Sequence, residues 1–176
     1  MRLIVTSVLI GALTLSVACA EAKPYTRNVA IVVYENAEPL DWTGPYEVYN
    51  HAGHAGAVNG ENAFNVYIVS KTKEPVNAQG LHVVPSYSIQ DAPKPDIVLF
   101  PGGPANRITD DPEFFAWAKK VSIEAEIAQS VCTGAFVLAK AGLLDGREAT
   151  THPEGIEKLK RDAPRTKVHT NTCFSY

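Results

Sequence analysis

The chain has 176 residues, of which 45% are apolar and 20% charged, so it is long enough for one domain with a sizeable core. It is too short for two ordinary domains. The formal net charge of −3 provides no basic surface of the kind that neutralises phosphates, which excludes nucleic acid as an expected partner.

Residues 1–20, MRLIVTSVLIGALTLSVACA, are typical of a secretory signal peptide, because Arg2 precedes an apolar run that ends in an A-x-A cleavage pattern. The run is shorter than the roughly 20 residues that a membrane-spanning helix needs. Lipidation at Cys19 is a weaker alternative, since Leu15 lies one place too early for that motif. We therefore predict a periplasmic or secreted protein without stable membrane insertion after processing, with residues 28–176 as its domain.

Beyond the signal peptide, short apolar runs alternate with helical segments, which predicts an α/β fold with a mostly parallel sheet covered on both faces. Buried strands are expected at residues 28–34, 64–70, 96–100 and 127–131, a shorter edge-like strand at 81–85 and a last one at 167–170. Helices are expected after Pro39, with Pro45 in the first turn, after Asp111, and at residues 133–141 and 155–161. Active sites in such folds lie at the carboxyl ends of the strands.

The segment QSVCTGAF places Cys132 on the turn between a predicted strand and a predicted helix. The positive end of a helix dipole and its unpaired N–H groups favour a thiolate, which is the nucleophilic form of cysteine. Small residues after Cys132 leave room for a substrate. A buried structural cysteine is the alternative interpretation of the same position.

Two other segments support a reactive site. Gly102 and Gly103 end the preceding strand in sequence, and their N–H groups, with that of Thr133, are candidates to stabilise an anionic intermediate. The loop ATTHP places His152 about twenty residues after Cys132, within reach of a Cys-His pair. Alone, a Pro-Gly-Gly turn or a loop histidine carries little information.

Four motifs in this order, VAIVVYENAEPLDWTGPYEVY, IVLFPGG, SVCTGAF and LLDGREATTHP, resemble the PfpI/ThiJ superfamily of class I glutamine-amidotransferase-like proteins. The LDWTGPYEVY segment and the VCTGA elbow are most similar to the branch that contains isonitrile hydratases and the ligand-binding domains of some AraC-type regulators. The likeness runs from Val29 to the C-terminus. It implies a flavodoxin-like three-layer αβα sandwich, here without the last strand and C-terminal helix of its relatives.

The resemblance implies that Cys132 is the elbow nucleophile, that Gly103 and Thr133 are oxyanion-hole positions, and that His152 is the nearby histidine. It assigns the acidic partner of the nucleophile to Asp41. The alternative for Asp41 is a helix cap or turn residue.

Other polar and aromatic residues receive simpler interpretations. Trp42 and Tyr46 either wall a pocket or pack in the core. His51 and His54 are spaced like a metal pair but lack further ligands, so no metal or cofactor is expected. Four aspartates are expected to serve turns and caps: Asp91, Asp96, Asp110 and Asp111.

The function implied is a cysteine-dependent hydratase or hydrolase of a small electrophilic substrate, similar to isonitrile hydratase. A non-catalytic small-molecule binding domain and a thiol-based stress or redox protein are the alternatives. The resemblance allows a homodimer. We also expect the nearby helix to lower the pKa of Cys132, and the thiol to raise the pKa of Asp41.

Overall fold

The computed structural model describes residues 25–57 and 60–170. The predicted signal peptide, Cys19 and Cys173 lie outside the described residues. Among the described helices, none combines the length and the apolar character that crossing a bilayer requires.

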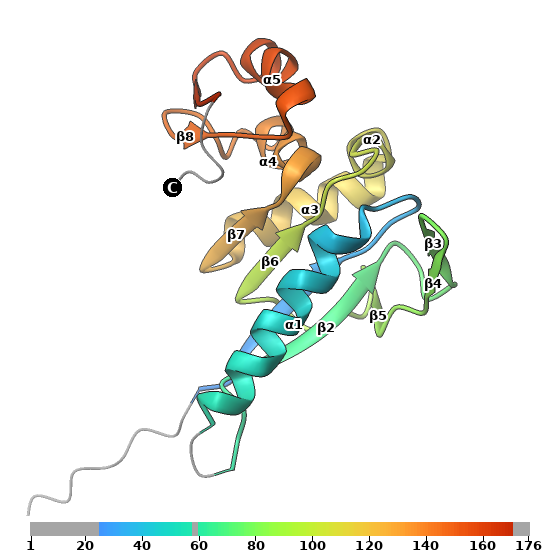
Figure 1. Cartoon of the computed structure of the whole chain (residues 1–176). Helices are drawn as coiled ribbons and strands as arrows, with labels where there is room; N and C mark the ends of the chain where they lie inside the picture. Colours follow the sequence, from blue (N-terminus) through green and yellow to red (C-terminus); the bar gives the residue numbers. More distant parts are fainter. Residues whose placement is uncertain (1–24, 58–59, 171–176) are drawn as a thin grey trace, which may run out of the picture.

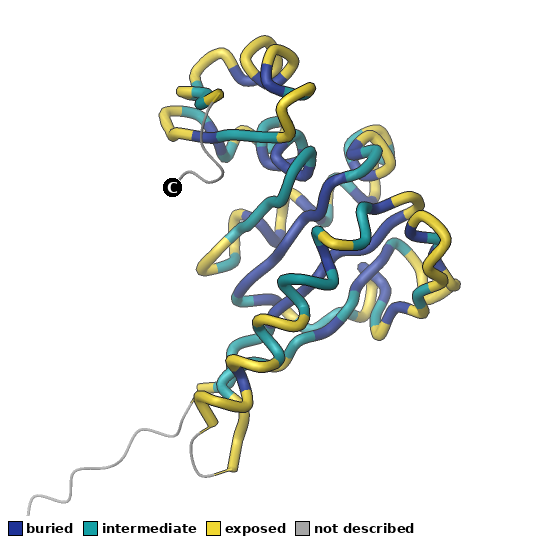
Figure 2. Tube along the Cα trace, in the orientation of Figure 1, coloured by how far each residue is buried: buried dark blue, intermediate teal, exposed yellow. Residues whose placement is uncertain are grey.

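The core of the fold is a five-stranded sheet with the order β5-β2-β1-β6-β7, in which every neighbouring pair is parallel. These strands are β1 (Arg27–Val32), β2 (Phe64–Ser70), β5 (Tyr87–Ser88), β6 (Ile97–Phe100) and β7 (Ile127–Ser130). The two central strands β1 and β6 consist largely of buried apolar residues, as the unbroken apolar runs predict (Figure 2).

Helices lie on both faces of this sheet, with α1 in front of it and α3 behind it in the view of Figure 1. The helices are α1 (Pro39–Ala55), α2 (Asn106–Thr109), α3 (Pro112–Glu124), α4 (Ala135–Lys140) and α5 (Ile156–Asp162). The predicted α/β fold with a mostly parallel sheet is confirmed.

The strand predicted at residues 81–85 does not join the main sheet. Instead β4 (Leu81–Val83) pairs antiparallel with β3 (Val76–Ala78) in a separate hairpin. Its tight turn uses Gln79 and Gly80, with φ of 51° and 96°, the left-handed conformations that two-residue hairpins favour. The short β5 takes the predicted edge position.

The last predicted strand is also separate from the main sheet. Only Lys167–Val168 forms a strand, β9, which pairs with β8 (Glu148–Ala149) in a small parallel sheet. Two-residue strands such as these leave almost no apolar run in the sequence, which is why β8 was not predicted.

The first helix is longer than the sequence suggested. It has 17 residues and begins at Pro39, so Pro45 lies in the second turn rather than the first. Because proline has no N–H group, Pro45 gives up the hydrogen bond to the carbonyl of Asp41. Near Pro45, the half-buried Thr43 hydroxyl donates to the Pro39 carbonyl at 2.7 Å.

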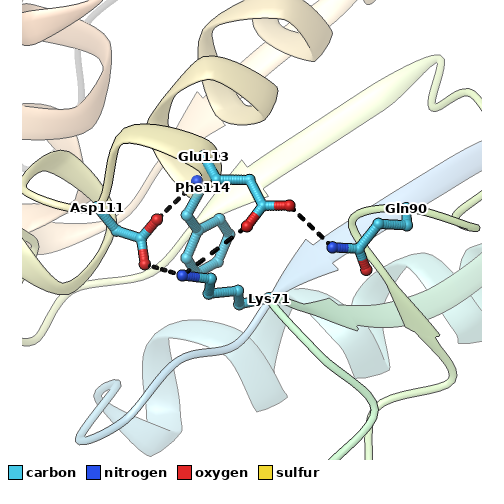
Figure 3. A network of polar contacts seen from close by, with 5 residues as sticks. All are labelled: Lys71, Gln90, Asp111, Glu113 and Phe114. Atoms are coloured by element: carbon cyan, nitrogen blue, oxygen red, sulfur yellow. Dashed lines mark hydrogen bonds and ion pairs between the residues drawn. The ribbon is translucent and has the colours of Figure 1, made fainter.

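Asp111 caps α3, as its sequence position predicts, by accepting a hydrogen bond from the Phe114 N–H at 3.0 Å. Lys71, which follows β2, binds the same carboxylate, and Gln90 donates to Glu113 at 3.0 Å (Figure 3). This network joins the end of β2 to the start of α3. Asp91 lies at a turn and Asp110 at the C-cap of α2, as predicted. Asp96 instead accepts a hydrogen bond from the Asn28 N–H at 2.8 Å and so joins the start of β6 to β1.

Candidate active site

Cys132 sits on a strained turn between β7 and the 3-10 helix Cys132–Gly134, which leads directly into α4. Its φ is +54°, a left-handed conformation that costs a non-glycine residue about 1–2 kcal/mol. The turn is held by Val131 N–H, which donates to the Phe100 carbonyl at 3.0 Å, and by Thr151, whose hydroxyl donates to the Cys132 carbonyl at 2.8 Å. Strain kept by fixed neighbours is typical of a nucleophile elbow.

Asp41 reaches the same place from the first turn of α1. Its carboxylate Oδ2 accepts a hydrogen bond from the Gly102 N–H at 2.9 Å. The carboxylate lies beside the Cys132 thiol, close enough for each group to shift the pKa of the other. The N-cap of α1 is Glu38, whose side chain makes no capping bond. Asp41 is therefore a partner of the cysteine and not a helix cap.

Gly102 separates these two side chains and has no room for a side chain of its own. A Cβ atom at this position would lie 2.5 Å from Asp41 Oδ2, 2.7 Å from Cys132 Cβ and 2.9 Å from Cys132 Sγ. Contacts below 3 Å to two side chains cannot both be relieved without moving the pair. Gly102 is therefore required because it has no side chain, which lets Asp41 and Cys132 come close together. The Pro-Gly-Gly sequence predicts a turn but not this role.

Gly103 and Thr133 form a second contact between the same two turns. The Gly103 N–H donates to Thr133 Oγ1 at 2.9 Å, and the Thr133 hydroxyl donates to the Gly103 carbonyl at 2.8 Å. Gly103 has a φ of +117°, and a Cβ there would lie 2.6 Å from the Asn36 carbonyl oxygen. Of the three predicted oxyanion donors, the amides of Gly102 and Gly103 are therefore hydrogen-bonded within the protein, whereas the Thr133 amide lies beside the Cys132 sulfur.

A buried tyrosine that the sequence analysis did not single out supports this turn. The hydroxyl of Tyr34 contacts the carbonyls of Pro101 and Gly102 at 2.8 and 3.0 Å. Tyr34 follows a predicted buried strand, and a buried tyrosine hydroxyl needs a polar partner. This position could therefore have indicated a residue that supports the site.

Burial raises the pKa of Cys132 above its usual value, and the nearby Asp41 carboxylate raises it further. The Thr133 amide and hydroxyl beside the sulfur lower this pKa, but their effect is smaller than that of burial and the carboxylate. Our expectation that the helix end lowers this pKa was wrong. The sulfur is half-buried beside a carboxylate, and α4 has only six residues, which limits its dipole.

Burial also raises the pKa of Asp41, and the charge of Glu38 raises it further, while the hydrogen bond from Gly102 opposes the shift. The raised direction agrees with the expectation, but its expected cause was wrong: the Cys132 thiol lowers the pKa of Asp41, and burial raises it. The Asp41 carboxylate in turn raises the pKa of Cys132, which favours the protonated sulfur.

His152 lies near the pair without joining it. The residue is exposed at the N-cap of the 3-10 helix Pro153–Gly155, and its ring forms no hydrogen bond with the residues that the structure describes. Its charge lowers the pKa of Asp41, which indicates proximity. The Cys-His pair is therefore not formed, and Thr151 is the residue that ties this loop to the elbow.

Cys132 opens onto a cavity of about 1380 Å³ that runs along β7. Its walls include Gly44, Pro45 and Val48 on α1 and His152 on the opposite loop. Trp42 and Tyr46 do not line it. Trp42 is buried in the core, its Nε1 without a hydrogen-bond partner among the described residues.

No group of three or more His, Cys, Asp or Glu side chains within residues 25–57 and 60–170 is arranged to hold a metal ion. His51 and His54 lie in the last turns of α1, where His54 Nδ1 contacts the Asn50 carbonyl at 2.7 Å.

A family model described as the DJ-1/PfpI family matches residues 27–173. The chain therefore belongs to the DJ-1/PfpI family. This is the superfamily that the four sequence motifs indicated.

Two curated relatives refine the placement. An uncharacterized protein in the cpoL 5′ region of Streptomyces lividans is 36% identical over 141 residues, covering 78% of this chain and 95% of the relative. The isonitrile hydratase of Pseudomonas putida is 31% identical over 127 residues, covering 71% of this chain and 52% of the hydratase. The matched region is thus about half the length of that hydratase.

Solved structures share the fold. A ThiJ/PfpI family protein from Pseudomonas syringae superimposes with a TM-score of 0.69 at 24% identity, over 87% of this chain and 62% of that one. An AraC family transcriptional regulator from Pseudomonas putida superimposes with a TM-score of 0.66 at 22% identity, over 81% of this chain and 76% of that one. The predicted branch, with isonitrile hydratases and AraC-type regulators, is confirmed.

Proposed function

We propose that this chain is a cysteine-dependent hydratase of a small electrophilic substrate, for which an isonitrile is the best-supported class. The proposal is supported by the likeness to an isonitrile hydratase, by the position of the Asp41 carboxylate beside Cys132, and by the cavity at the sulfur. Cys132 is the nucleophile and Asp41 the general base.

The first half of the reaction forms a covalent thioimidate. The Cys132 proton passes to the Asp41 carboxylate as the sulfur attacks the terminal carbon of R–N≡C. Asp41 then gives this proton to the same carbon, producing R–N=CH–S–Cys132. A neutral thiol beside a carboxylate is the resting state that this step requires, and the raised pKa of Cys132 favours it.

The second half consumes one water. Asp41 removes a proton from the water, whose oxygen adds to the thioimidate carbon, and Asp41 then gives this proton to the nitrogen. The carbon–sulfur bond then breaks, the remaining hydroxyl proton returns to sulfur through Asp41, and R–NH–CHO leaves. Overall, R–N≡C and H₂O give an N-substituted formamide with the enzyme unchanged.

The observation that carries this choice is the state of the Gly102 and Gly103 amides. Hydrolysis of an ester or amide builds charge on a carbonyl oxygen and needs free donors for it. Here Gly102 N–H is bound to Asp41 and Gly103 N–H to Thr133. Attack on an isonitrile builds charge on carbon, which the proton held by Asp41 neutralises. This arrangement supports a hydratase over an acyl hydrolase.

Incubation of the purified protein with a panel of alkyl and aryl isonitriles, with formamide measured by mass spectrometry, tests the proposal. Cys132→Ser should abolish product, and Asp41→Asn should reduce it by about 10²-fold or more, the usual contribution of a general base. Cys173→Ser, which removes another thiol of the same chain, is the matched control and should retain activity. Absence of formamide from every isonitrile with the unmodified protein would overturn the proposal.

A small-molecule binding domain without turnover is the second candidate, since the raised pKa of Cys132 keeps the sulfur protonated and less reactive. Saturable ligand binding without product would favour it. Oxidation of Cys132 to a stable sulfinic acid by mild peroxide would favour the redox alternative.

We also propose that residues 1–20 direct export and are removed. The n-region arginine, the apolar run and the A-x-A pattern support this assignment. Intact-mass measurement of the protein from the periplasmic fraction tests it, since cleavage after Ala20 leaves a chain that begins at Glu21. A full-length mass from the cytoplasmic fraction alone contradicts export.

A further inference from the structure

The helix α1 contains two interior glycines, Gly44 and Gly53, although glycine weakens a helix interior. Gly53 is explained by packing, because a Cβ there would lie 3.2 Å from the Phe64 carbonyl oxygen and 3.4 Å from its nitrogen. Gly44 has no such reason. A Cβ at Gly44 would meet only Leu40 Cδ1, at 4.0 Å, and the Leu40 side chain is itself exposed. Packing within the protein therefore does not require a glycine at this position.

Gly44 faces the candidate active site. It follows Asp41 by three residues, which places it on the same side of α1 and about 4.5 Å further along the helix axis. Gly44, Pro45 and Val48 line the same cavity as Cys132. The empty space beside Gly44 is thus a part of the cavity next to the reacting atoms.

The part of the cavity wall that α1 supplies around this space is apolar, whereas charged side chains such as Glu126, Arg147 and Glu148 line other parts of the cavity. Val48 is 65% exposed although it is a large aliphatic residue, and with Pro45 it continues the helix face that begins at Asp41. Val131, the residue that follows β7, lines the same cavity. At the far end the Tyr49 hydroxyl donates to Gln129 Oε1 at 2.7 Å, which satisfies the polar group of the tyrosine. An uncharged alkyl or aryl group loses nothing by entering such a space, whereas a charged group loses its hydration.

We propose that Gly44 is a specificity-determining position: its missing side chain leaves the space that receives an apolar alkyl or aryl substituent of the substrate held at Cys132. The inference rests on the proposed function for the identity of the reaction. It does not depend on turnover, because the space beside Gly44 also controls which thiol reagents reach Cys132.

Alkylation rates of Cys132 measured with two maleimides test the inference, N-methylmaleimide as the small reagent and N-cyclohexylmaleimide as the bulky one. The variants are Gly44→Ala, Gly44→Leu and Glu47→Leu. Glu47→Leu adds the same side chain to an exposed position of α1 that does not line the cavity. Thermal unfolding of each variant verifies that it is folded.

Gly44→Leu should slow the cyclohexyl reagent about tenfold or more while the methyl reagent changes by less than about twofold, since a filled pocket discriminates by size. Gly44→Ala should give an intermediate effect, and it keeps the test decisive where the leucine variant fails to fold. Equal changes with both reagents, or the same effect in Glu47→Leu, would overturn the inference.

The outcomes also separate this inference from the proposed function. Size-dependent alkylation without formamide from any isonitrile removes the hydratase and leaves the role of Gly44. Formamide production with rates that do not depend on substituent size in Gly44→Leu removes the role of Gly44 and leaves the hydratase.

Discussion

Asp41 and Cys132 approach Gly102 from two sides, so that Asp41 Oδ2 and Cys132 Sγ lie 2.5 and 2.9 Å from the point where a Cβ of residue 102 would be. Three separate turns, after β1, β6 and β7, meet at this point because the carboxyl ends of parallel strands share one edge of the sheet. Cys132, Asp41 and Gly102 therefore form one structural unit, in which the small glycine allows the thiol and the carboxylate to lie side by side.

Gly102→Ala should separate this pair. The new methyl group cannot fit between the two side chains, and a displacement of about 1 Å at a reacting group costs roughly 10²-fold in rate. Formamide production should therefore fall by about this factor. Circular dichroism should show retained secondary structure, and activity equal to that of the parent protein would contradict the described packing.

Thr133→Val should weaken the contact between the β6 and β7 turns. The valine removes two hydrogen bonds to Gly103 and leaves its N–H buried without a partner, which costs about 1–3 kcal/mol of unfolding free energy. It also removes the hydroxyl that lowers the pKa of Cys132, so the pKa of that thiol should rise further. Urea unfolding measures the first effect, and Thr133→Ser, which keeps the hydroxyl, should restore most of the stability.

Gly134→Ala tests the packing of the elbow against β6. A Cβ at Gly134 would overlap the Phe100 carbonyl oxygen and lie 2.9 Å from the Pro101 carbonyl oxygen. Backbone atoms cannot turn aside as a flexible side chain can. The variant should lose about 1–3 kcal/mol of stability, as overpacked cores do. An unchanged melting temperature would show that the elbow packs differently.

Two variants at the start of α3 compare the contribution of a helix cap to stability with that of a surface ion pair. Asp111→Ala removes the bond to the Phe114 N–H and should cost about 1 kcal/mol. Lys71→Met removes only solvent-screened ion pairs, with Asp111 and Glu113, which contribute little to stability. Chemical unfolding should rank Asp111→Ala as the more destabilising change, and the reverse order would contradict the assignment of the cap.

Long apolar runs made the main sheet predictable. Strands such as β1 and β6 are buried on both faces, and burial on both faces requires apolar residues without interruption. The β3–β4 hairpin and the β8–β9 pair are two or three residues long, and they are fixed by turn geometry and by neighbouring loops. A pattern of hydrophobicity carries little information about such strands.

The sequence predicted that Cys132 and Asp41 lie together, but it did not predict the direction in which the pKa of Cys132 is shifted. Cys132 and Asp41 follow strands that end at one sheet edge, and motif and topology therefore brought them together. The pKa of Cys132 depends on how deeply the sulfur is buried and on how close the carboxylate lies, which are three-dimensional quantities. In the same way, His152 shares the cavity with Cys132 but its orientation follows from the loop, not from its spacing in sequence.

The pH dependence of Cys132 alkylation in the parent protein and in Asp41→Asn tests the Cys132–Asp41 unit most directly. Alkylation requires the thiolate, so the midpoint of the profile reports the pKa of the sulfur. The carboxylate charge raises that pKa, and the amide removes the charge while keeping an oxygen that accepts from Gly102. The midpoint should lie above that of an ordinary thiol in the parent and move to lower pH in Asp41→Asn. An unchanged midpoint, or one that moves to higher pH, would contradict the account.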